Sequence, residues 1–165
     1  MQSESMENVE MRRFTARDRD WLVAAHRDAY ARAEGFDDSF AVLVASILDE
    51  FLCDHDPLCE TGWIVWQKRR RLGSIFCVKL DDSTAKLRLF MLIEKARGKG
   101  LGQRMLETCM GFAREQGYRE MKLWTHESHR AAGVLYARNG WTLLSSQPVV
   151  SFGRPLIEQH WEITL

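Results

Sequence analysis

Three glycines at alternate positions lie in one short segment of the sequence: Gly98, Gly100 and Gly102. Because glycine has no Cβ, a backbone with this spacing can approach a ligand closely and can point several N–H groups toward it. Apolar residues recur at helical spacing after Gly100, so the N-terminus of a helix would add its partial positive charge at the same place. Three basic side chains supply further charge there: Arg97, Lys99 and Arg104. The chemistry that this segment could perform is the binding of a phosphate or a pyrophosphate.

Two common phosphate-binding motifs do not fit the segment. A Walker-type loop requires the pattern G-x-x-x-x-G-K-[ST], and no run in the sequence has it. A dinucleotide fingerprint requires G-x-G-x-x-G, but counting from Gly100 places Met105 where its third glycine should be. What remains is Arg97-x-x-Gly100-x-Gly102, a pattern that a plain glycine-rich connection between a strand and a helix could also produce.

This pattern resembles the [QR]-x-x-G-x-[GA] signature of the GNAT superfamily of acyl-CoA-dependent N-acyltransferases. A later motif of that family runs alanine, three residues, tyrosine, three residues, glycine and an aromatic residue; Ala132, Tyr136 and Gly140-Trp141 match it. The similarity extends from Val9 to the end of the chain. Four short segments make the chain most similar to GNAT domains fused to MarR-type DNA-binding domains: residues 117–119, 123–125, 151–153 and 161–162. A chain of 165 residues has no room for that DNA-binding half, so we expect it to be absent.

The resemblance implies a site that binds acetyl-CoA as a cosubstrate. The strand that ends at Ile93 should separate from the strand over residues 121–125 and open a slot for the pantetheine arm. Backbone groups at the end of the first strand would pair with that arm, one N–H would polarise the thioester carbonyl, and the glycine loop would wrap the pyrophosphate. Ten residues are the cofactor-binding candidates: Met91, Leu92, Ile93, Arg97, Gly98, Lys99, Gly100, Leu101, Gly102 and Gln103. Tyr136, which matches the tyrosine of the family, would protonate the departing CoA thiolate, although a core tyrosine could also stand there.

The general base is where the sequence departs from the family. Some members carry a glutamate six residues before a conserved valine, and counting back from Ile93 gives Leu87 instead. We take His126 and Glu127, just after a predicted strand, as the catalytic candidates, because histidine titrates near neutral pH. A solvated strand end is the alternative for both residues, with water or bulk solvent then accepting the proton. Lys95 also stands where the family often has proline, and the connection to Arg97 is one residue shorter than usual, so the turn into the glycine loop should be tighter.

A metal site is not expected. The H-E-x-x-H pattern places two histidines four residues apart on one helical turn, whereas His126 and His129 are three apart across a predicted strand-to-helix boundary. The four cysteines show no C-x-x-C spacing, so we expect free thiols.

The composition excludes several classes of protein. The 165 residues include 23 basic and 23 acidic ones, which give a formal net charge of +0, whereas a dedicated nucleic-acid-binding protein normally carries a basic excess. No run approaches the roughly 20 apolar residues that cross a bilayer, and the polar, acidic start does not resemble a signal peptide. We therefore expect a cytoplasmic protein that binds neither nucleic acid nor membranes. It should form one acetyltransferase domain over residues 9–165, after a disordered tail over residues 1–8.

The hydrophobic pattern predicts the scaffold that must position these residues. Short or alternating apolar runs predict strands over residues 9–14, 63–66, 74–80, 85–93, 121–125, 141–144 and 156–164. Helical spacing predicts helices from about residue 17 to Gly35, from Asp38 or Ser39 to before Pro57, from Gly100 to Gly117, and over residues 131–138. The expected fold class is therefore α/β (α+β), with a single mixed, mostly antiparallel central sheet and flanking helices.

Together these features predict an N-acetyltransferase that transfers an acetyl group from acetyl-CoA to a primary amine of a small molecule, by direct attack in a ternary complex. The early helices (residues 21–51) and a loop over residues 145–155 should build the acceptor pocket. Four acidic residues there could attract a cationic amine: Asp37, Asp38, Asp54 and Asp56. Two alternatives stay open, a protein acetyltransferase acting on lysine or N-terminal amines and a non-catalytic acyl-CoA-binding regulatory module. The prediction is compatible with a homodimer.

Overall fold

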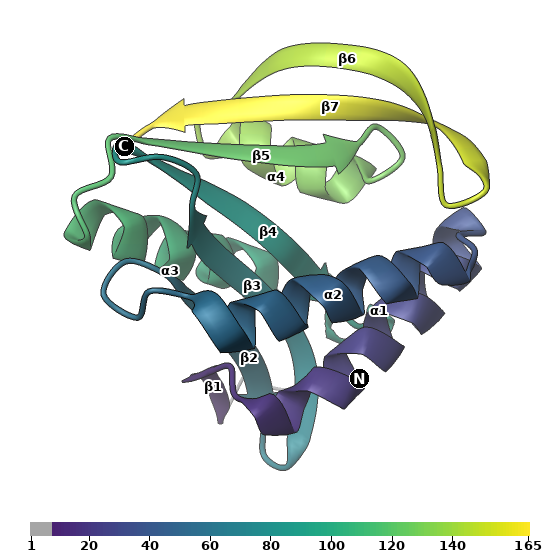
Figure 1. The fold of residues 1–165 in the computed structure, drawn as a ribbon, viewed down its shortest axis with the longest axis horizontal. Helices are drawn as coiled ribbons and strands as arrows, with labels where there is room; N and C mark the ends of the chain where they lie inside the picture. The colour runs from purple at the N-terminus through teal and green to yellow at the C-terminus, as the bar shows by residue number, and fades with distance from the viewer. Residues whose placement is uncertain (1–7) are drawn as a thin grey trace.

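The computed structural model describes residues 8–165, which form one seven-stranded sheet with helices on both faces (Figure 1). In chain order the elements are β1 (Val9–Arg13), α1 (Arg19–Glu34), α2 (Asp38–Asp54), β2 (Thr61–Gln67), β3 (Arg70–Lys79), β4 (Thr84–Leu92), α3 (Leu101–Glu115), β5 (Glu120–His126), α4 (Arg130–Arg138), β6 (Thr142–Ser151) and β7 (Arg154–Thr164), with 3₁₀ helices over Ala16–Asp18 and Glu94–Ala96. The strand order is β1-β2-β3-β4-β5-β7-β6; β4 and β5 run parallel, and the other neighbouring pairs run antiparallel. The expected fold class is therefore confirmed. The predicted tail over residues 1–8 lies, apart from Asn8, outside the described residues.

Two predicted boundaries shift for local reasons. The N-cap of α2 is Asp37, whose side chain accepts a hydrogen bond from the Ser39 N–H at 3.0 Å, so Asp38 is already helical. The basic turn predicted over residues 67–72 shrinks to residues 68–69, because β2 and β3 continue their pairing almost to the tip of the hairpin.

The predicted loop over residues 145–155 is wrong. β6 and β7 pair along this segment as far as Ser151 and Arg154, so it is the arm of a long hairpin. Phe152 and Gly153 make its two-residue turn, with φ of 55° and 74°. Two successive residues with positive φ match the right-handed twist of paired strands, and glycine at the second position reduces the strain of the turn.

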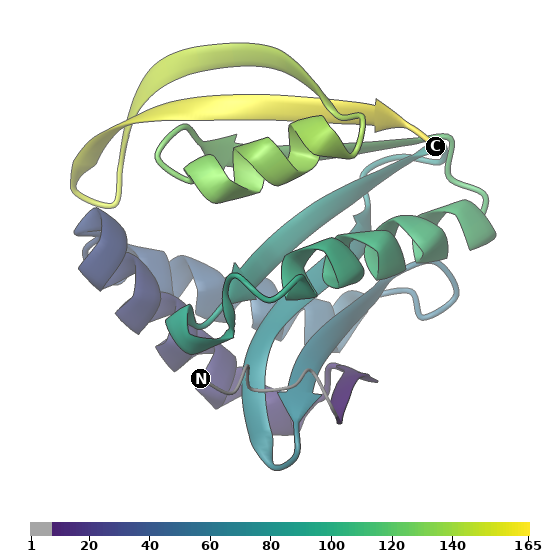
Figure 2. The same cartoon turned by 180° about the vertical axis from the view of Figure 1, so that it is seen from behind.

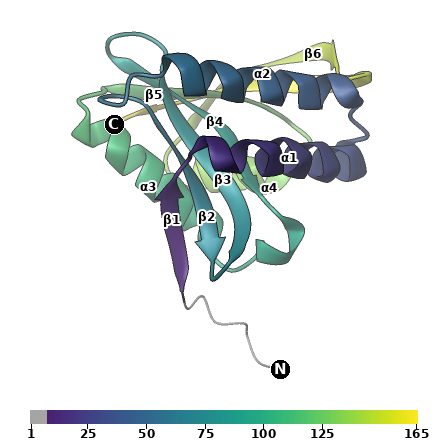
Figure 3. The same ribbon diagram turned by 60° about the horizontal axis from the view of Figure 1, so that its bottom comes forward.

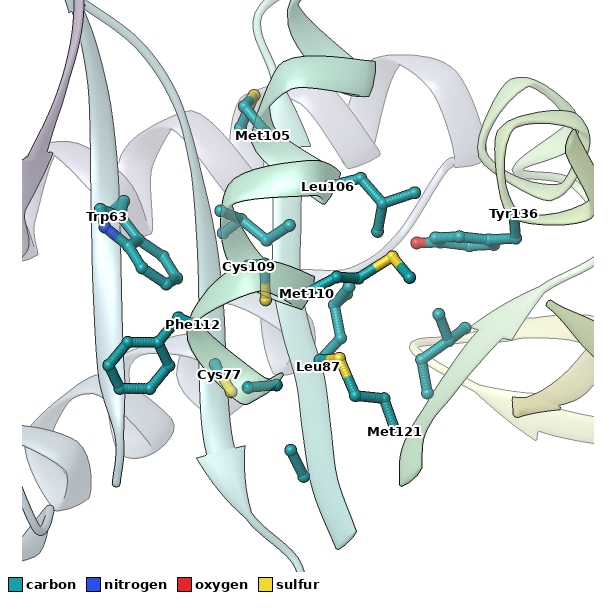
Figure 4. Close-up of a cluster of buried hydrophobic side chains, with 14 of the residues drawn as sticks. Trp63, Cys77, Leu87, Met105, Leu106, Cys109, Met110, Phe112, Met121 and Tyr136 are labelled. Atoms are coloured by element: carbon teal, nitrogen blue, oxygen red, sulfur yellow. The ribbon is translucent and has the colours of Figure 1, made fainter. Parts of the chain in front are cut away.

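Helices cover both faces of the sheet and bury two cores. Figure 1 shows α1 and α2 in front of the sheet, and Figure 2 shows α3 and α4 on the opposite face. In the view from below, α1 and α2 pass in front of the strands, and β1 lies beside β2 (Figure 3). Leu87 packs in the core on the α3 side, with Cys109 and Met110 of that helix (Figure 4). Phe76 packs in the other core, with Leu22 of α1.

β4 and β5 pair only where they begin. Their ladder joins Thr84–Lys86 to Glu120–Lys122, after which the two strands separate. A bulge in β4 accompanies the separation: Leu89 has φ of 51°, and the register with β3 shifts at this point. The Ser74 hydroxyl donates to the Leu89 carbonyl at 2.6 Å and so satisfies a backbone group that the bulge frees. The predicted splaying of these strands is confirmed, and it opens a slot through the sheet. None of the helices in residues 8–165 has the length and apolarity that crossing a membrane requires.

His26 on α1 makes the stability of the protein depend on pH. Its side chain is buried, its Nδ1 lies 2.9 Å from the Leu22 carbonyl oxygen, and burial lowers its pKa to about 4. In the unfolded chain His26 has a pKa near 6.5, so it takes up a proton there before it does so in the folded protein. The contribution of neutral His26 to the free energy of unfolding is therefore complete above pH 6.5 and is lost as the pH falls toward 4. We expect the free energy of unfolding of His26→Leu to fall less between about pH 7.5 and about pH 5 than that of the wild type, by about 2 kcal/mol. Urea unfolding at both pH values measures this difference, and an equal fall in both proteins would contradict it.

Candidate functional site

A cavity of about 580 Å³ lies where β4 and β5 separate. Its walls come from the separated halves of both strands, from the C-terminal part of α1, from α4 and from the loop that precedes α3. Gly98 and Gly102 line one part of it, and Phe36 and Phe40 line another. The cavity therefore connects the predicted phosphate site with the face of the sheet that carries α1 and α2.

The glycine loop presents unpaired backbone N–H groups. Gly98 and Gly100 have φ of 75° and 82°, a left-handed conformation that glycine adopts without strain. Gly100 caps α3, and the first main-chain bond of that helix runs from the Arg104 N–H to the Gly100 carbonyl at 3.3 Å, which leaves the N–H groups of residues 101–103 without a partner in the helix. A Cβ built on Gly98 or Gly100 would meet no atom within 4 Å, so the space beside these two glycines is open. This geometry fits a pyrophosphate.

The basic side chains near the loop point in different directions. The Arg97 Nε donates to the Leu92 carbonyl at 3.1 Å, and Arg97 lines the cavity. Arg104 instead reaches the Val9 carbonyl of β1 at 3.3 Å, so the expected grouping of Arg97, Lys99 and Arg104 around the phosphate is wrong for Arg104. The Gln103 side-chain amide is held by three hydrogen bonds of 2.7 Å: it donates to Glu107 and to Asn139, and it accepts from Asn139. Its side-chain amide is therefore occupied, whereas its backbone N–H, like those of Leu101 and Gly102, has no partner in the helix.

The three predicted residues of β4 do not present their backbone alike. The Ile93 N–H donates to the Leu72 carbonyl of the neighbouring chain segment at 2.8 Å, so it cannot also bind the pantetheine arm. Met91 is paired with Ser74 of β3, on the same side as Ile93. Because backbone groups alternate along a strand, the Leu92 N–H faces the slot. Among Met91, Leu92 and Ile93, the Leu92 amide is therefore the one that this alternation turns away from β3 and toward the slot.

Tyr136 lies in the wall of the cavity. Its ring packs between Trp141 and Trp161 of the core, with ring centroids 5.6 Å and 5.9 Å away. Its hydroxyl points across the gap between α4 and α3, toward Leu106 and Met110 (Figure 4). Burial raises the pKa of Tyr136, with smaller effects from neighbouring groups, so the phenol stays protonated at neutral pH.

The two base candidates have different environments. His126 is half-buried and lines the cavity; burial lowers its pKa, and the nearby carboxylates of Glu158 and Glu34 oppose that shift. It is therefore neutral near pH 7 and able to accept a proton. Glu127 is exposed and does not line the cavity, so the structure does not bring it to the site.

Sequence reasoning missed a group of residues that the fold gathers beside His126. Glu34 of α1 lines the cavity, and its side chain is only 12% exposed. Its Oε1 lies 3.5 Å from the His129 Nε2, and Tyr30 packs on the His129 ring with centroids 5.0 Å apart. Burial lowers the pKa of His129, and Glu34 opposes the shift. The available signal was the spacing of Tyr30 and Glu34, one turn apart on α1, but nothing local linked them to a segment almost a hundred residues later.

The acidic residues expected in the acceptor pocket do not line the cavity: Asp37, Asp38, Asp54 and Asp56. Among the described residues that line it, Glu34 is the one with a carboxylate. Aromatic side chains stand in this region instead. The ring centroid of Phe152, in the β6–β7 turn, lies 4.9 Å from that of Phe36 and 5.0 Å from that of Phe40.

Comparisons with known proteins find a matching sequence family and solved structures with the same fold. A sequence model described as "Acetyltransferase (GNAT) family" matches residues 10–141. Human N-acetyltransferase 8B is 32% identical over 91 residues, which cover 50% of this chain and 40% of that protein; the matched part is thus less than half of the curated relative. Ribosomal-protein-alanine N-acetyltransferase from Brucella melitensis has a TM-score of 0.76 at 17% identity, covering 94% of this chain and 99% of that one. A GNAT family acetyltransferase from Elizabethkingia anophelis with acetyl-CoA bound has a TM-score of 0.67 at 15% identity, covering 96% and 99%. At these identities the solved structures share the fold.

Proposed function

Because the chain belongs to the acetyltransferase (GNAT) family and is an acetyl-CoA-dependent acetyltransferase, we propose that it acetylates a primary amine of a small molecule by direct attack in a ternary complex. The observation that carries this proposal is that one continuous cavity joins the glycine loop to the histidines and to the face with α1 and α2. Its volume of about 580 Å³ suits a small acceptor beside the acyl end of the cosubstrate. Its relation to MarR-fused domains, its cytoplasmic location and a homodimer stay predictions.

The described residues fit acetyl-CoA, which supplies an acetyl thioester. The open glycine loop and the first N–H groups of α3 would hold its pyrophosphate, with Arg97 beside them. The Leu92 N–H would donate to the thioester oxygen, where negative charge grows as the amine approaches. In the overall transfer the amine nitrogen bonds to the acetyl carbon, the carbon–sulfur bond breaks, the nitrogen loses one proton and the sulfur gains one. His126 would accept the proton of the amine.

The role of Tyr136 follows from its acidity. Burial raises its pKa above the usual value of about 10, whereas a free thiol has a pKa near 8.5. Complete transfer of the phenolic proton to the sulfur is therefore uphill. We assign Tyr136 the donation of a hydrogen bond that stabilises the leaving thiolate, a refinement of the proton transfer that the family resemblance implies. The proton that the sulfur finally carries then comes from solvent, or from protonated His126, which holds the proton that the amine has lost.

Tyr136→Phe tests this role. We expect kcat to fall about 10- to 100-fold, because a hydrogen bond to a charged group contributes about 1.5 to 3 kcal/mol. The Kd for acetyl-CoA should change little, since the ring and its packing remain. Steady-state kinetics and calorimetric titration measure the two quantities, and unchanged turnover would remove Tyr136 from the mechanism.

The proposal as a whole is tested by thiol release from acetyl-CoA with a panel of primary amines. Direct attack requires both substrates to be bound to the enzyme at once. Double-reciprocal plots of initial rate against acetyl-CoA concentration, at several fixed amine concentrations, should therefore give intersecting lines. Parallel lines would indicate a covalent acetyl-enzyme and contradict direct attack. Acetylation of peptides alone would favour a protein acetyltransferase, and acetyl-CoA binding without thiol release would favour a regulatory module.

A further inference from the structure

Arg88 of β4 is a half-buried guanidinium without a partner at the acceptor side of the cavity. It lines the cavity, and it forms no hydrogen bond or ion pair with any residue in the described part of the chain. Burial lowers its pKa; Lys86 and Glu50 are the charged neighbours with which it interacts at longer range. Arginine side chains in such places normally pair with a carboxylate or a phosphate, because their planar fork of donors matches two oxygens.

The register of β4 places Arg88 on the face that an acceptor would use. Arg88 pairs with Phe76 of β3, which packs in the core beneath α1 and α2. Leu87, its neighbour, packs in the core on the α3 side. Since side chains alternate along a strand, Arg88 points toward the layer of α1 and α2, the layer that also carries Glu34. The glycine loop belongs to the start of α3, on the other layer.

The cavity therefore offers two opposite charges and an apolar surface to the acceptor. Glu34 supplies its carboxylate and Arg88 supplies a free guanidinium. Phe36, Phe40 and Trp124 line the same space. A ligand that satisfies all of these groups has an amine, an anionic oxygen pair and an apolar substituent.

We propose that the acceptor is an amine that also carries a carboxylate, of the amino-acid class with an apolar side chain, and that Arg88 binds this carboxylate. The inference rests on the proposed function and specifies its substrate. Arg88 would orient the acceptor so that its amine lies near His126 and Glu34. It would act as a specificity-determining residue, and the acetyl transfer itself would need no chemistry from it.

Matched pairs of acceptors test the proposal: phenylalanine with phenethylamine, leucine with isopentylamine, and alanine with ethylamine. Each pair differs mainly by the carboxylate. For the wild-type enzyme we expect kcat/KM to be higher for the amino acid than for its carboxylate-free partner, by about 30-fold for phenylalanine, since losing one member of a desolvated charge pair has an effect of this order. In Arg88→Gln the ratio of the two kcat/KM values should fall close to one, because the KM for the amino acid rises. Arg88→Lys should restore part of it.

Lys86→Gln is the matched control. Lys86 lies two residues before Arg88 on the same strand, but its ammonium lies 4.6 Å from the Trp124 ring centroid and the residue does not line the cavity. Removing this charge should leave the preference for the carboxylate intact, whereas a general electrostatic effect would lower the preference in both variants and contradict the proposal.

Two outcomes separate this inference from the proposed function. Equal acetylation of both members of each pair by the wild type, or a preference that survives in Arg88→Gln, would overturn the role of Arg88 and leave the acetyltransferase activity standing. Acetylation of no amine would overturn the proposed function. In that case calorimetric titration of phenylalanine into the CoA-saturated protein still tests Arg88: weaker binding to Arg88→Gln supports the carboxylate site, and equal or undetectable binding to both proteins contradicts it.

Discussion

Gly100→Asp should weaken acetyl-CoA binding at least about 100-fold, because it places a carboxylate where the pyrophosphate is expected. Like charges about 4 Å apart near a protein surface repel each other by about 4 kcal/mol. A Cβ at this position has no protein atom within 4 Å, so it makes no clash with the protein. Aspartate also tolerates the left-handed conformation that Gly100 adopts at φ of 82° better than most residues. The backbone strain at this φ is common to Asp and Asn, so the difference between these two substitutions measures the effect of the charge on the ligand.

Two variants serve as controls for this measurement by calorimetric titration. Gly100→Asn adds the same bulk in the same conformation without the charge, so its loss of affinity should be at least about tenfold smaller. Gly111→Asp adds a charge later in α3, at another glycine with nothing within 4 Å, and should leave the Kd unchanged. Retained binding in Gly100→Asp would overturn the assignment of the loop.

His126→Gln should lower kcat about 100-fold if His126 accepts the proton of the amine, the usual size of general-base catalysis. Burial lowers the His126 pKa below its usual value near 6.5, so the histidine is neutral over the neutral range. The ratio of wild-type kcat to variant kcat cancels the titration of the amine itself. This ratio should be constant above about pH 6.5 and should fall toward one as the pH drops through the pKa of His126.

The ratio of wild-type kcat to variant kcat also decides between the two base candidates that the sequence offers. Glu127 is exposed and lies outside the cavity, so Glu127→Gln should show no comparable loss. Acetyl-CoA binding should be unchanged in both variants, because neither residue belongs to the glycine loop. A ratio for His126→Gln that is near one at neutral pH would leave the proton to water and contradict our assignment.

The elements and the glycine loop could be predicted from the sequence because their signals are local. Gly100 starts α3 and Gly35 ends α1, as their spacing from the apolar positions indicates. Hydrophobic periodicity likewise predicted the seven strands. The hairpin over residues 145–155 was mistaken for a loop because its exposed strands carry polar residues, proline and glycine, and their pairing depends on the β7 partner instead of on burial.

The site could be predicted only in part, because its chemistry depends on which way groups face and on contacts between distant segments. Sequence alone did not show that the backbone N–H groups of Leu92 and Ile93 point in opposite directions. These directions are set by the pairing of β4 with β3 and by the bulge at Leu89. Glu34 and His129 are far apart in the chain, and they meet only because β4 and β5 separate between α1 and α4. Arg88 was visible as a basic residue in a strand, but its lack of a partner is a property of the folded protein.

A crystal structure of the complex with acetyl-CoA tests the central claim most directly. We expect the pyrophosphate to accept hydrogen bonds from backbone N–H groups of residues 98–103. We also expect the thioester to lie in the slot between β4 and β5, within reach of the Leu92 N–H and the Tyr136 hydroxyl. A pyrophosphate bound away from the glycine loop, or a thioester outside the slot, would contradict this claim.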